Sequence, residues 1–240
     1  LLREADAMAV NAKDSPIKTV FIGGGTPSTL PAELLQRLLT GLHERFHIPA
    51  GSEFTSEANP GTLTPEWLDA AISGGVNRLS MGMQASQPEL LRTLGRIHTQ
   101  ADVETSVQLA RKHGIGNISV DLMFGLPGQT PDMWRESLDA ALSLGVDHMS
   151  CYGLIPEDDT PLKRDLDTGR LSLPDEGDER QMYDDALHIL SQHSYQQYEI
   201  SNFAKPGLES RHNMRYWLTR PYIGFGPAAA SDFGGKRFNV

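Results

Sequence analysis

The chain has 240 residues, of which 39% are hydrophobic and 22% charged, as in an ordinary globular protein with one large domain or a domain with an appendage. Its net charge of −10 argues against a basic duplex-DNA-binding face, and its single cysteine, Cys151, excludes a disulfide framework or a complete metal cluster built from its own cysteines. No apolar run approaches the roughly 20 residues that a membrane helix needs. We therefore expect a cytoplasmic protein with small-molecule partners and no nucleic acid.

The two ends of the sequence look interrupted. Leu1–Asp6 has a helical phase and no initiating methionine, and Arg237–Val240 resembles an unfinished strand. We interpret the chain as a fragment that is truncated at both ends.

Short apolar runs alternate along the chain with helical patterns. Strands are predicted at residues 19–22, 54–57, 78–82, 117–123 and 148–152. Helices are predicted between them, at residues 34–46, from Thr64 to Gly74, from a Ser86 cap to Leu94, at residues 101–113 and from Thr130 to about Gly145. Repeated strand–helix units imply a parallel sheet, which an open doubly wound sheet and a closed or partial barrel both satisfy.

The predicted strands carry one apolar face and one polar face. Parallel strands that are covered on both sides are usually apolar on both faces. A barrel with helices outside and a polar ligand inside explains this pattern. The charged positions lie in or near the carboxyl-terminal halves of their strands, where barrel enzymes build their sites. The positions on the polar face are Thr55, Glu57, Ser80, Gly82, Gln84, Ser119 and Asp121.

The pattern changes after about Pro156. Residues 156–174 are charged and rich in turns, residues 181–191 have helical spacing, and residues 195–203 resemble a strand. Residues 211–240 are rich in glycine and aromatic residues. We predict a core barrel over residues 1–155 and a C-terminal α+β extension over residues 156–240.

The glycine-rich segment Gly23–Pro27 follows the first predicted strand. Glycines remove Cβ atoms, so that backbone groups can approach a ligand closely. A simple tight turn explains a lone run of three glycines about equally well. The segment matches neither the dinucleotide-binding GxGxxG pattern nor the P-loop.

Glu57, Gln84 and Asp121 lie near the ends of successive strands on the predicted inner face. Each alone is more often a structural hydrogen-bonding residue, but three together are suited to hold an ammonium group, ribose hydroxyls or an adenine edge. Arg96 follows the next helix and could clamp a carboxylate, although a surface arginine is the simpler interpretation of that residue alone.

His212 stands in the segment His212–Trp217, beside aromatic residues. A histidine can ligate iron and aromatic side chains can line a porphyrin. A histidine among aromatic residues is, however, more often part of ordinary packing. Cys151 has no close cysteine or histidine companion, which favours a buried thiol.

Taken together, six motifs resemble the oxygen-independent coproporphyrinogen III oxidase family of radical S-adenosylmethionine (SAM) proteins, in order and over nearly the whole chain. His212-Asn213-x-x-Tyr216-Trp217 and the spelling Glu57-Ala58-Asn59-Pro60 are similar to its HemW-type haem-chaperone subgroup. The six motifs are residues 21–27, 56–61, 77–84, 94–98, 120–129 and 195–199.

The resemblance implies a partial (β/α) barrel of TIM-like type whose first strand and cluster-binding cysteines lie outside this chain. It implies that a [4Fe-4S] cluster belongs to the full-length protein and that haem associates with His212. The residues that it assigns to SAM are Gly24, Gly25, Thr26, Glu57, Gln84, Arg96 and Asp121.

The expected function is haem binding and transfer to haem-dependent proteins. One alternative is SAM-dependent oxidative decarboxylation of coproporphyrinogen III in porphyrin biosynthesis, an enzyme activity that is not expected of this fragment. A second alternative is a barrel enzyme whose glycine loop binds a phosphate, without radical chemistry.

Overall fold

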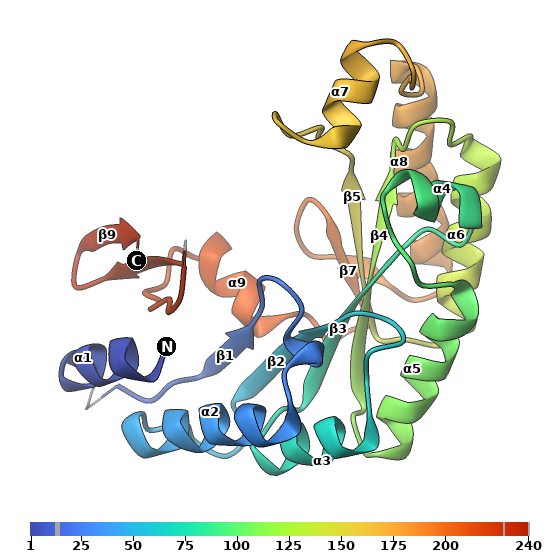
Figure 1. Cartoon of the computed structure of the whole chain (residues 1–240). Coiled ribbons are helices and arrows are strands. Elements are labelled where there is room, and N and C mark those ends of the chain that lie inside the picture. Colours follow the sequence, from blue (N-terminus) through green and yellow to red (C-terminus); the bar gives the residue numbers. More distant parts are fainter. Residues whose placement is uncertain (13–14, 228, 240) are drawn as a thin grey trace. The chain divides into compact units, whose positions relative to one another are not determined.

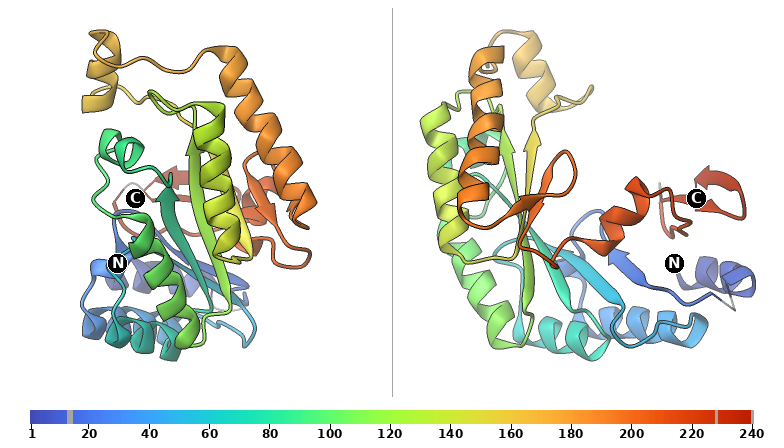
Figure 2. Two further views of the ribbon diagram at one scale, coloured as in Figure 1. Left: turned by 90° about the vertical axis from the view of Figure 1, so that its right-hand side faces the viewer. Right: turned by 180° about the vertical axis from the view of Figure 1, so that it is seen from behind.

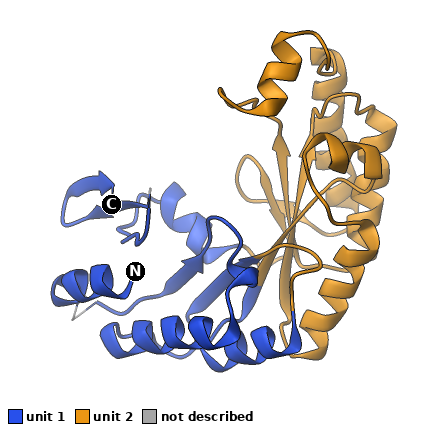
Figure 3. Ribbon diagram, viewed as in Figure 1, with its two compact units in different colours: residues 1–57, 64–78, 210–240 blue, residues 58–63, 79–209 orange. Residues whose placement is uncertain are grey.

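The structure, a computed structural model, describes residues 1–12, 15–227 and 229–239 (Figure 1). It divides into two compact units (Figure 3). Unit 1 contains Leu1–Glu57, Thr64–Arg78 and Ser210–Val240, and unit 2 contains Ala58–Leu63 and Leu79–Glu209. The domain boundary near residue 155 stays a prediction.

Unit 1 contains the first parallel pair of strands. Strand β1 (Thr19–Ile22) pairs with β2 (Glu53–Ala58), and Thr19 lies opposite Glu53. This confirms the predicted strands and their parallel direction. The other elements are α1 (Leu2–Ala12), the 3₁₀ helix η1 (Pro27–Thr29), α2 (Ala32–Arg45), α3 (Pro65–Ser73), α9 (Arg211–Trp217) and the antiparallel hairpin β8 (Ala230–Phe233) with β9 (Lys236–Asn239). Val240, the end of the predicted final strand, lies outside the described residues.

Helices α2 and α3 both contribute to the core of unit 1. Leu39 of α2 and Trp67 of α3 are buried, and the Trp67 indole donates a hydrogen bond of 3.2 Å to the Pro27 carbonyl. Helix α3 begins as predicted, because the Thr64 hydroxyl accepts a hydrogen bond from the Trp67 backbone N–H. A Cβ added to Gly74 would lie 2.3 Å from Leu39, so the approach of the two helices requires glycine at this position.

Unit 2 contains a mixed sheet with the strand order β3-β4-β5-β7-β6. Strands β4 and β5 are parallel, as predicted, whereas β7 runs antiparallel to both β5 and β6. Helices α5, α6 and α8 lie on one side of these strands (Figure 2). The bounds are β3 (Arg78–Gln84), α4 (Pro88–Thr93), α5 (Gln100–Lys112), β4 (Asn117–Phe124), α6 (Pro131–Ser143), β5 (His148–Gly153), α7 (Pro161–Asp167), α8 (Glu176–Gln192), β6 (Gln196–Gln197) and β7 (Asn202–Ala204).

Apolar side chains from the strands and helices of unit 2 form its core. Val120, Leu122 and Leu138 are fully buried. The buried Trp134 of α6 donates a hydrogen bond of 2.7 Å from its indole to the Met182 carbonyl of α8. This bond satisfies the indole N–H in the core and ties the two helices together.

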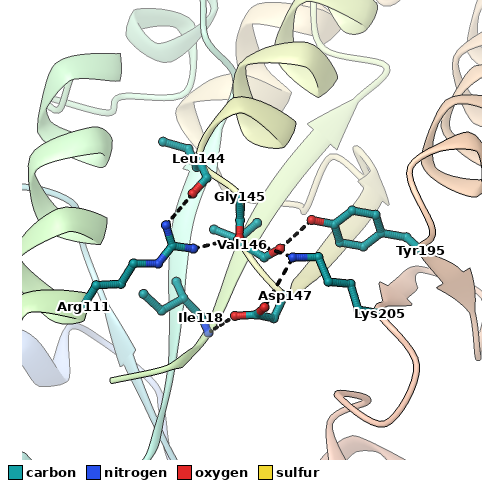
Figure 4. Close-up of polar contacts among 8 residues, drawn as sticks. All are labelled: Arg111, Ile118, Leu144, Gly145, Val146, Asp147, Tyr195 and Lys205. Atoms are coloured by element: carbon teal, nitrogen blue, oxygen red, sulfur yellow. Dashed lines mark hydrogen bonds and ion pairs between the residues drawn. The ribbon is translucent and has the colours of Figure 1, made fainter. Parts of the chain in front are cut away.

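The turn from α6 into β5 is held by side chains from other elements (Figure 4). Arg111 of α5 donates hydrogen bonds of 2.8 Å to the Leu144 carbonyl and 2.7 Å to the Gly145 carbonyl. The Tyr195 hydroxyl donates to the next carbonyl, that of Val146. We call this arrangement the carbonyl clamp. It lies at the amino-terminal end of β5, the end of a barrel that contributes stability rather than chemistry.

The predicted Ser86 cap is wrong. Helix α4 begins at Pro88 with Gln87 at the N-cap position, and no side-chain hydrogen bond caps it. The Ser86 hydroxyl and backbone N–H both lie 3.2 Å from the Ser137 hydroxyl of α6. A tertiary contact therefore uses the groups that a local cap would need.

The predicted strand over residues 195–203 is also wrong in part. The segment forms two short strands, β6 and β7, joined by a turn in which the Tyr198 N–H donates to the Asn202 carbonyl. The Glu199 carboxylate accepts hydrogen bonds from the Ser201 N–H and the Asn202 side chain, which stabilise the turn. The segment adds a hairpin to the sheet rather than one strand.

Among the helices in the described part of the chain, none is both long enough and apolar enough to cross a membrane.

Candidate functional site

The glycine loop connects β1 to η1, and each of its glycines has a structural reason. Gly24 and Gly25 have φ angles of 80° and 71°, in the left-handed region that favours glycine. A side chain on either would meet nothing within 4 Å, so this stretch of backbone faces open space. At Gly23 an added Cβ would lie 2.5 Å from the Phe21 ring and 3.0 Å from the Glu57 carboxylate.

The structure brings the glycine loop and Glu57 together within unit 1. The Gly24 N–H donates a hydrogen bond of 3.0 Å to the Glu57 carboxylate. The hydroxyl of Thr55, two residues earlier on β2, is buried and has no hydrogen-bond partner among the residues that the structure describes. Thr26 is the N-cap residue of η1, and its carbonyl accepts hydrogen bonds from Thr29. A polar ligand would find a carboxylate, a buried hydroxyl and open backbone here.

Gln84 ends β3 in unit 2 with an unusual backbone. Its φ angle is 66°, a conformation that non-glycine residues seldom adopt, and its side chain is 7% exposed. The side chain folds back over Gly82, where an added Cβ would lie 2.6 Å from Gln84 Nε2. Such strained positions concentrate at functional sites, so the structure itself marks Gln84 as a candidate.

Asp121 lies in β4 opposite Ser150 of β5, also in unit 2. Its carboxylate accepts a hydrogen bond of 3.3 Å from the Ser80 hydroxyl, so these two residues of the predicted polar face are in contact. Arg96 is half-buried in the segment after α4, where its backbone N–H donates 2.8 Å to the Leu91 carbonyl. Gln84, Arg96 and Asp121 thus all belong to unit 2.

Cys151 is a buried thiol on β5, as expected. Burial, and to a lesser degree the negative charge of Asp121, raise the pKa of Cys151 far above its ordinary value, which keeps the thiol protonated. The part of the chain that the structure describes contains no group of three or more histidine, cysteine or acidic residues that could hold a metal ion. The residues present therefore do not fit an iron–sulfur cluster.

His212 is the second residue of α9, and each nitrogen of its ring lies close to a hydroxyl group. Its ring stacks on Phe21 with centroids 5.3 Å apart and planes 22° apart. Nδ1 lies 3.0 Å from the Thr19 hydroxyl of β1, and Nε2 lies 3.0 Å from the hydroxyl of Tyr216. All four residues belong to unit 1, and the sequence alone identified His212 but not its partner Thr19.

The environment of His212 disfavours its charged form. Burial lowers the pKa of His212 to about 4, and the positive charges of Arg215 and Arg78 contribute to the shift. The imidazole is therefore neutral at pH 7. A neutral imidazole is the form that binds a metal ion.

A buried carboxylate that the sequence did not reveal holds the start of α9. Glu53, at the beginning of β2, accepts hydrogen bonds of 2.7 Å from the Arg211 N–H and 2.8 Å from the His212 N–H. Ser210 caps the same helix through the Asn213 N–H. A carboxylate at a helix start satisfies free N–H groups and matches the helix dipole, so Glu53 fixes the backbone of His212.

A cavity of about 600 Å³ adjoins His212 within unit 1. This volume is in the usual range for small-molecule sites. The walls are mainly apolar and aromatic, with Lys18 and Arg215 as cationic members. The lining aromatic side chains include Phe21, Phe46, Tyr216, Tyr222, Phe225 and Phe233.

The sequence of the chain is similar to those of known proteins. Residues 1–141 match the model of the Radical SAM superfamily. The chain is 47% identical over 223 residues to the heme chaperone HemW of Bacillus subtilis and 41% identical over 222 residues to that of Lactococcus lactis. Each alignment covers 92% of this chain and 59% of the relative, so the chain spans about three-fifths of these curated relatives.

The fold resembles solved radical-SAM structures. Coproporphyrinogen III oxidase (HemN) from Escherichia coli superposes with a TM-score of 0.80 over 96% of this chain and 56% of that chain, at 24% sequence identity. The superposition confirms the predicted radical-SAM α/β fold, and the sequence similarity to the HemW proteins confirms the predicted affiliation with the HemW type. The chain belongs to the radical SAM superfamily.

Proposed function

We propose that the protein that contains this chain is a haem chaperone on a radical-SAM scaffold, which binds haem through His212 and transfers it to haem-dependent proteins. One observation carries the proposal: a neutral, anchored histidine lies at the wall of an aromatic cavity of about 600 Å³. The curated relatives that resemble the chain at 47% and 41% identity are named heme chaperones.

The residues around His212 fit a haem group. The ring is neutral, its Nδ1 edge is anchored to β1, and the partner of Nε2 is the side chain of Tyr216, which is 45% exposed. Aromatic and aliphatic walls suit a porphyrin face, and Lys18 and Arg215 suit its carboxylates. Haem would supply the iron that His212 ligates.

A SAM site is the second part of the proposal. The open backbone of Gly24 and Gly25, the Glu57 carboxylate and the buried hydroxyl of Thr55 suit a polar, zwitterionic ligand. We propose that Thr26, Gln84, Arg96 and Asp121 also contact SAM. SAM is a cofactor for radical chemistry. In this proposal the [4Fe-4S] cluster that SAM requires is bound by cysteines outside these 240 residues.

A haem titration of the full-length protein tests the first part. Wild type is expected to bind haem stably, and His212→Ala to lose at least about tenfold in affinity with the loss of a metal ligand. His188→Ala, which alters an exposed histidine of α8, is the matched control. Equal haem binding by His212→Ala and wild type would refute the proposal.

A product assay separates the chaperone from the alternative enzyme. Incubation with coproporphyrinogen III, SAM and a reductant is expected to give no decarboxylated product. Turnover to protoporphyrinogen without stable haem binding would favour the oxidase and overturn the chaperone proposal.

Calorimetric titration with SAM tests the second site. Glu57→Gln and Asp121→Asn are expected to weaken SAM binding by about tenfold each, since each removes a charged hydrogen-bond acceptor worth roughly 1.5 kcal/mol or more. Glu66→Gln on the exposed face of α3 is the control. Unchanged SAM affinity in both variants would contradict the assignment.

We further propose a cytoplasmic location and haem-accepting proteins as partners. The absence of a membrane-spanning helix among the described residues is compatible with this location. Co-purification of haem-dependent proteins with the haem-loaded wild type, but not with His212→Ala, would support the transfer role.

A further inference from the structure

The two nitrogens of the His212 ring lie in different surroundings. Nδ1 points to strand β1, where the Thr19 hydroxyl is 3.0 Å away. Nε2 points to Tyr216, one turn further along the same helix, whose hydroxyl is also 3.0 Å away. Thr19 is half-buried in the sheet, whereas the Tyr216 side chain is 45% exposed. The partner of Nε2 can move away, and the partner of Nδ1 is held by the strand.

Two contacts hold the ring in one orientation. It stacks on Phe21 at a centroid distance of 5.3 Å, and its backbone N–H is bonded to the Glu53 carboxylate at 2.8 Å. A ring flip would break the hydrogen bond to Thr19. Nε2 is therefore the nitrogen that can exchange its partner for a ligand from the cavity.

We infer that Thr19 is the positioning residue of the haem site: its hydroxyl accepts a hydrogen bond from Nδ1–H and so holds the His212 imidazole in the tautomer whose Nε2 lone pair binds the iron. This inference rests on the proposed haem-binding function. In this tautomer the Tyr216 hydroxyl, 3.0 Å away, donates to Nε2 and competes with the iron for its lone pair.

The chemistry of imidazole explains why this hydrogen bond matters. A neutral ring has one N–H donor and one acceptor nitrogen, so when the Thr19 hydroxyl accepts from Nδ1–H, Nε2 keeps the lone pair. Metal-binding histidines commonly donate their second N–H to an oxygen, which orients the ring and increases its basicity. Removal of such a partner typically lowers metal affinity about 10- to 100-fold.

The test uses three substitutions and one control. Thr19→Val removes the hydroxyl and keeps both the shape and the strand propensity of the side chain. Thr19→Ser restores the hydroxyl, and Tyr216→Phe removes the competing donor at Nε2. Thr93→Val, in α4, is the matched control, because the Thr93 hydroxyl donates to the Glu89 carbonyl of its own helix.

Two readouts are measured: haem affinity by titration, and the ¹⁵N shifts of the His212 ring in the haem-free protein. Wild type, Thr19→Ser and Thr93→Val are expected to show the Nδ1–H tautomer and equal haem affinity. Thr19→Val is expected to populate both tautomers and to bind haem at least about tenfold more weakly. Tyr216→Phe is expected to bind haem at least as tightly as wild type.

An unchanged tautomer and unchanged haem affinity in Thr19→Val would overturn the inference. A loss of affinity in Tyr216→Phe as large as that in Thr19→Val would also overturn it, because Nδ1 would then not be the anchored edge. If His212→Ala binds haem like wild type, the proposed function fails. The tautomer measurement, made without haem, still decides the role of Thr19.

Discussion

At the scale of single residues, Gln84 of unit 2 combines an unusual backbone angle with a close approach to a glycine. Gln84 has a φ angle of 66°, and its amide lies over Gly82, the residue two positions earlier on the same face. Only glycine at position 82 leaves room for the Gln84 amide, because an added Cβ there would lie 2.6 Å from Gln84 Nε2.

Gly82→Ala is therefore predicted to displace the Gln84 amide and to weaken SAM binding by about tenfold, the effect of losing about one good hydrogen bond. Calorimetric titration with SAM measures it. Gly116→Ala is the control, because an added Cβ there meets nothing within 4 Å. Equal losses in the two variants would show that the effect is not specific to Gln84.

Cys151 provides a test of burial. Burial and the charge of Asp121 both disfavour the thiolate, so the pKa of Cys151 is raised and its thiol stays protonated between pH 7 and 9. We predict no reaction with a thiol reagent in the native chain across this range and one reactive thiol in denaturant. Rapid native labelling that increases with pH would contradict the buried placement.

Residue types and spacing predicted some of these positions and not others. Gly24 follows one predicted strand and Glu57 ends the next, and the structure joins the two residues by a hydrogen bond. Glu53 and Thr19 carry no local signal, because their role depends on contact with α9, more than 150 residues later. Such long-range contacts leave no periodicity in the sequence.

At the scale of elements, the short helix α9 depends on β2 for its position. The buried Glu53 carboxylate accepts two backbone N–H groups at the start of the helix. Glu53→Gln replaces a charged double acceptor with an amide that can accept through only one atom. We predict a loss of about 1–2 kcal/mol in the free energy of unfolding.

Urea denaturation measures this loss, with the exposed Glu66→Gln of α3 as control. We also expect weaker haem binding in Glu53→Gln, because α9 carries His212. Full stability together with wild-type haem affinity would show that the carboxylate does not position the helix.

The carbonyl clamp gives a second prediction at this scale (Figure 4). Burial raises the pKa of Tyr195 to about 12, and the charge of Asp147 adds to the shift, so the hydroxyl remains a donor to the Val146 carbonyl at neutral pH. Tyr195→Phe leaves that buried carbonyl without this donor and should cost about 1–2 kcal/mol of unfolding free energy.

Tyr183→Phe is the matched control, because the Tyr183 hydroxyl accepts an exposed hydrogen bond from the Gln197 side chain. Chemical denaturation of the two variants compares the losses directly. An equal effect in both would mean that the clamp adds nothing specific to the turn.

Helix and strand periodicity predicted most elements well, including the parallel pairs β1/β2 and β4/β5. The errors lie where a tertiary contact replaced a local one, as at Ser86, or where a turn was hidden in a run of β-forming residues, as at residues 198–201. Element type follows from local pattern, whereas caps and turns depend on neighbours that the pattern does not contain.

At the scale of the whole molecule, the two proposed ligands use different sets of residues. The haem candidates His212, Thr19 and Tyr216 all belong to unit 1. The SAM candidates belong to both units, with Gly24, Gly25, Thr26 and Glu57 in unit 1 and Gln84, Arg96 and Asp121 in unit 2. Unit 1 combines the first and last parts of the chain. The sequence could not predict this, because the hydrogen bonds that hold the two parts together join residues about 160 positions apart.

The most direct test of the central claim is pulsed electron paramagnetic resonance of the ferric haem complex, made with ¹⁵N-histidine-labelled protein. We predict a coupling from one histidine nitrogen to the iron in wild type and in His188→Ala, and loss of that coupling in His212→Ala. A coupling that persists unchanged in His212→Ala would show that another residue binds the iron.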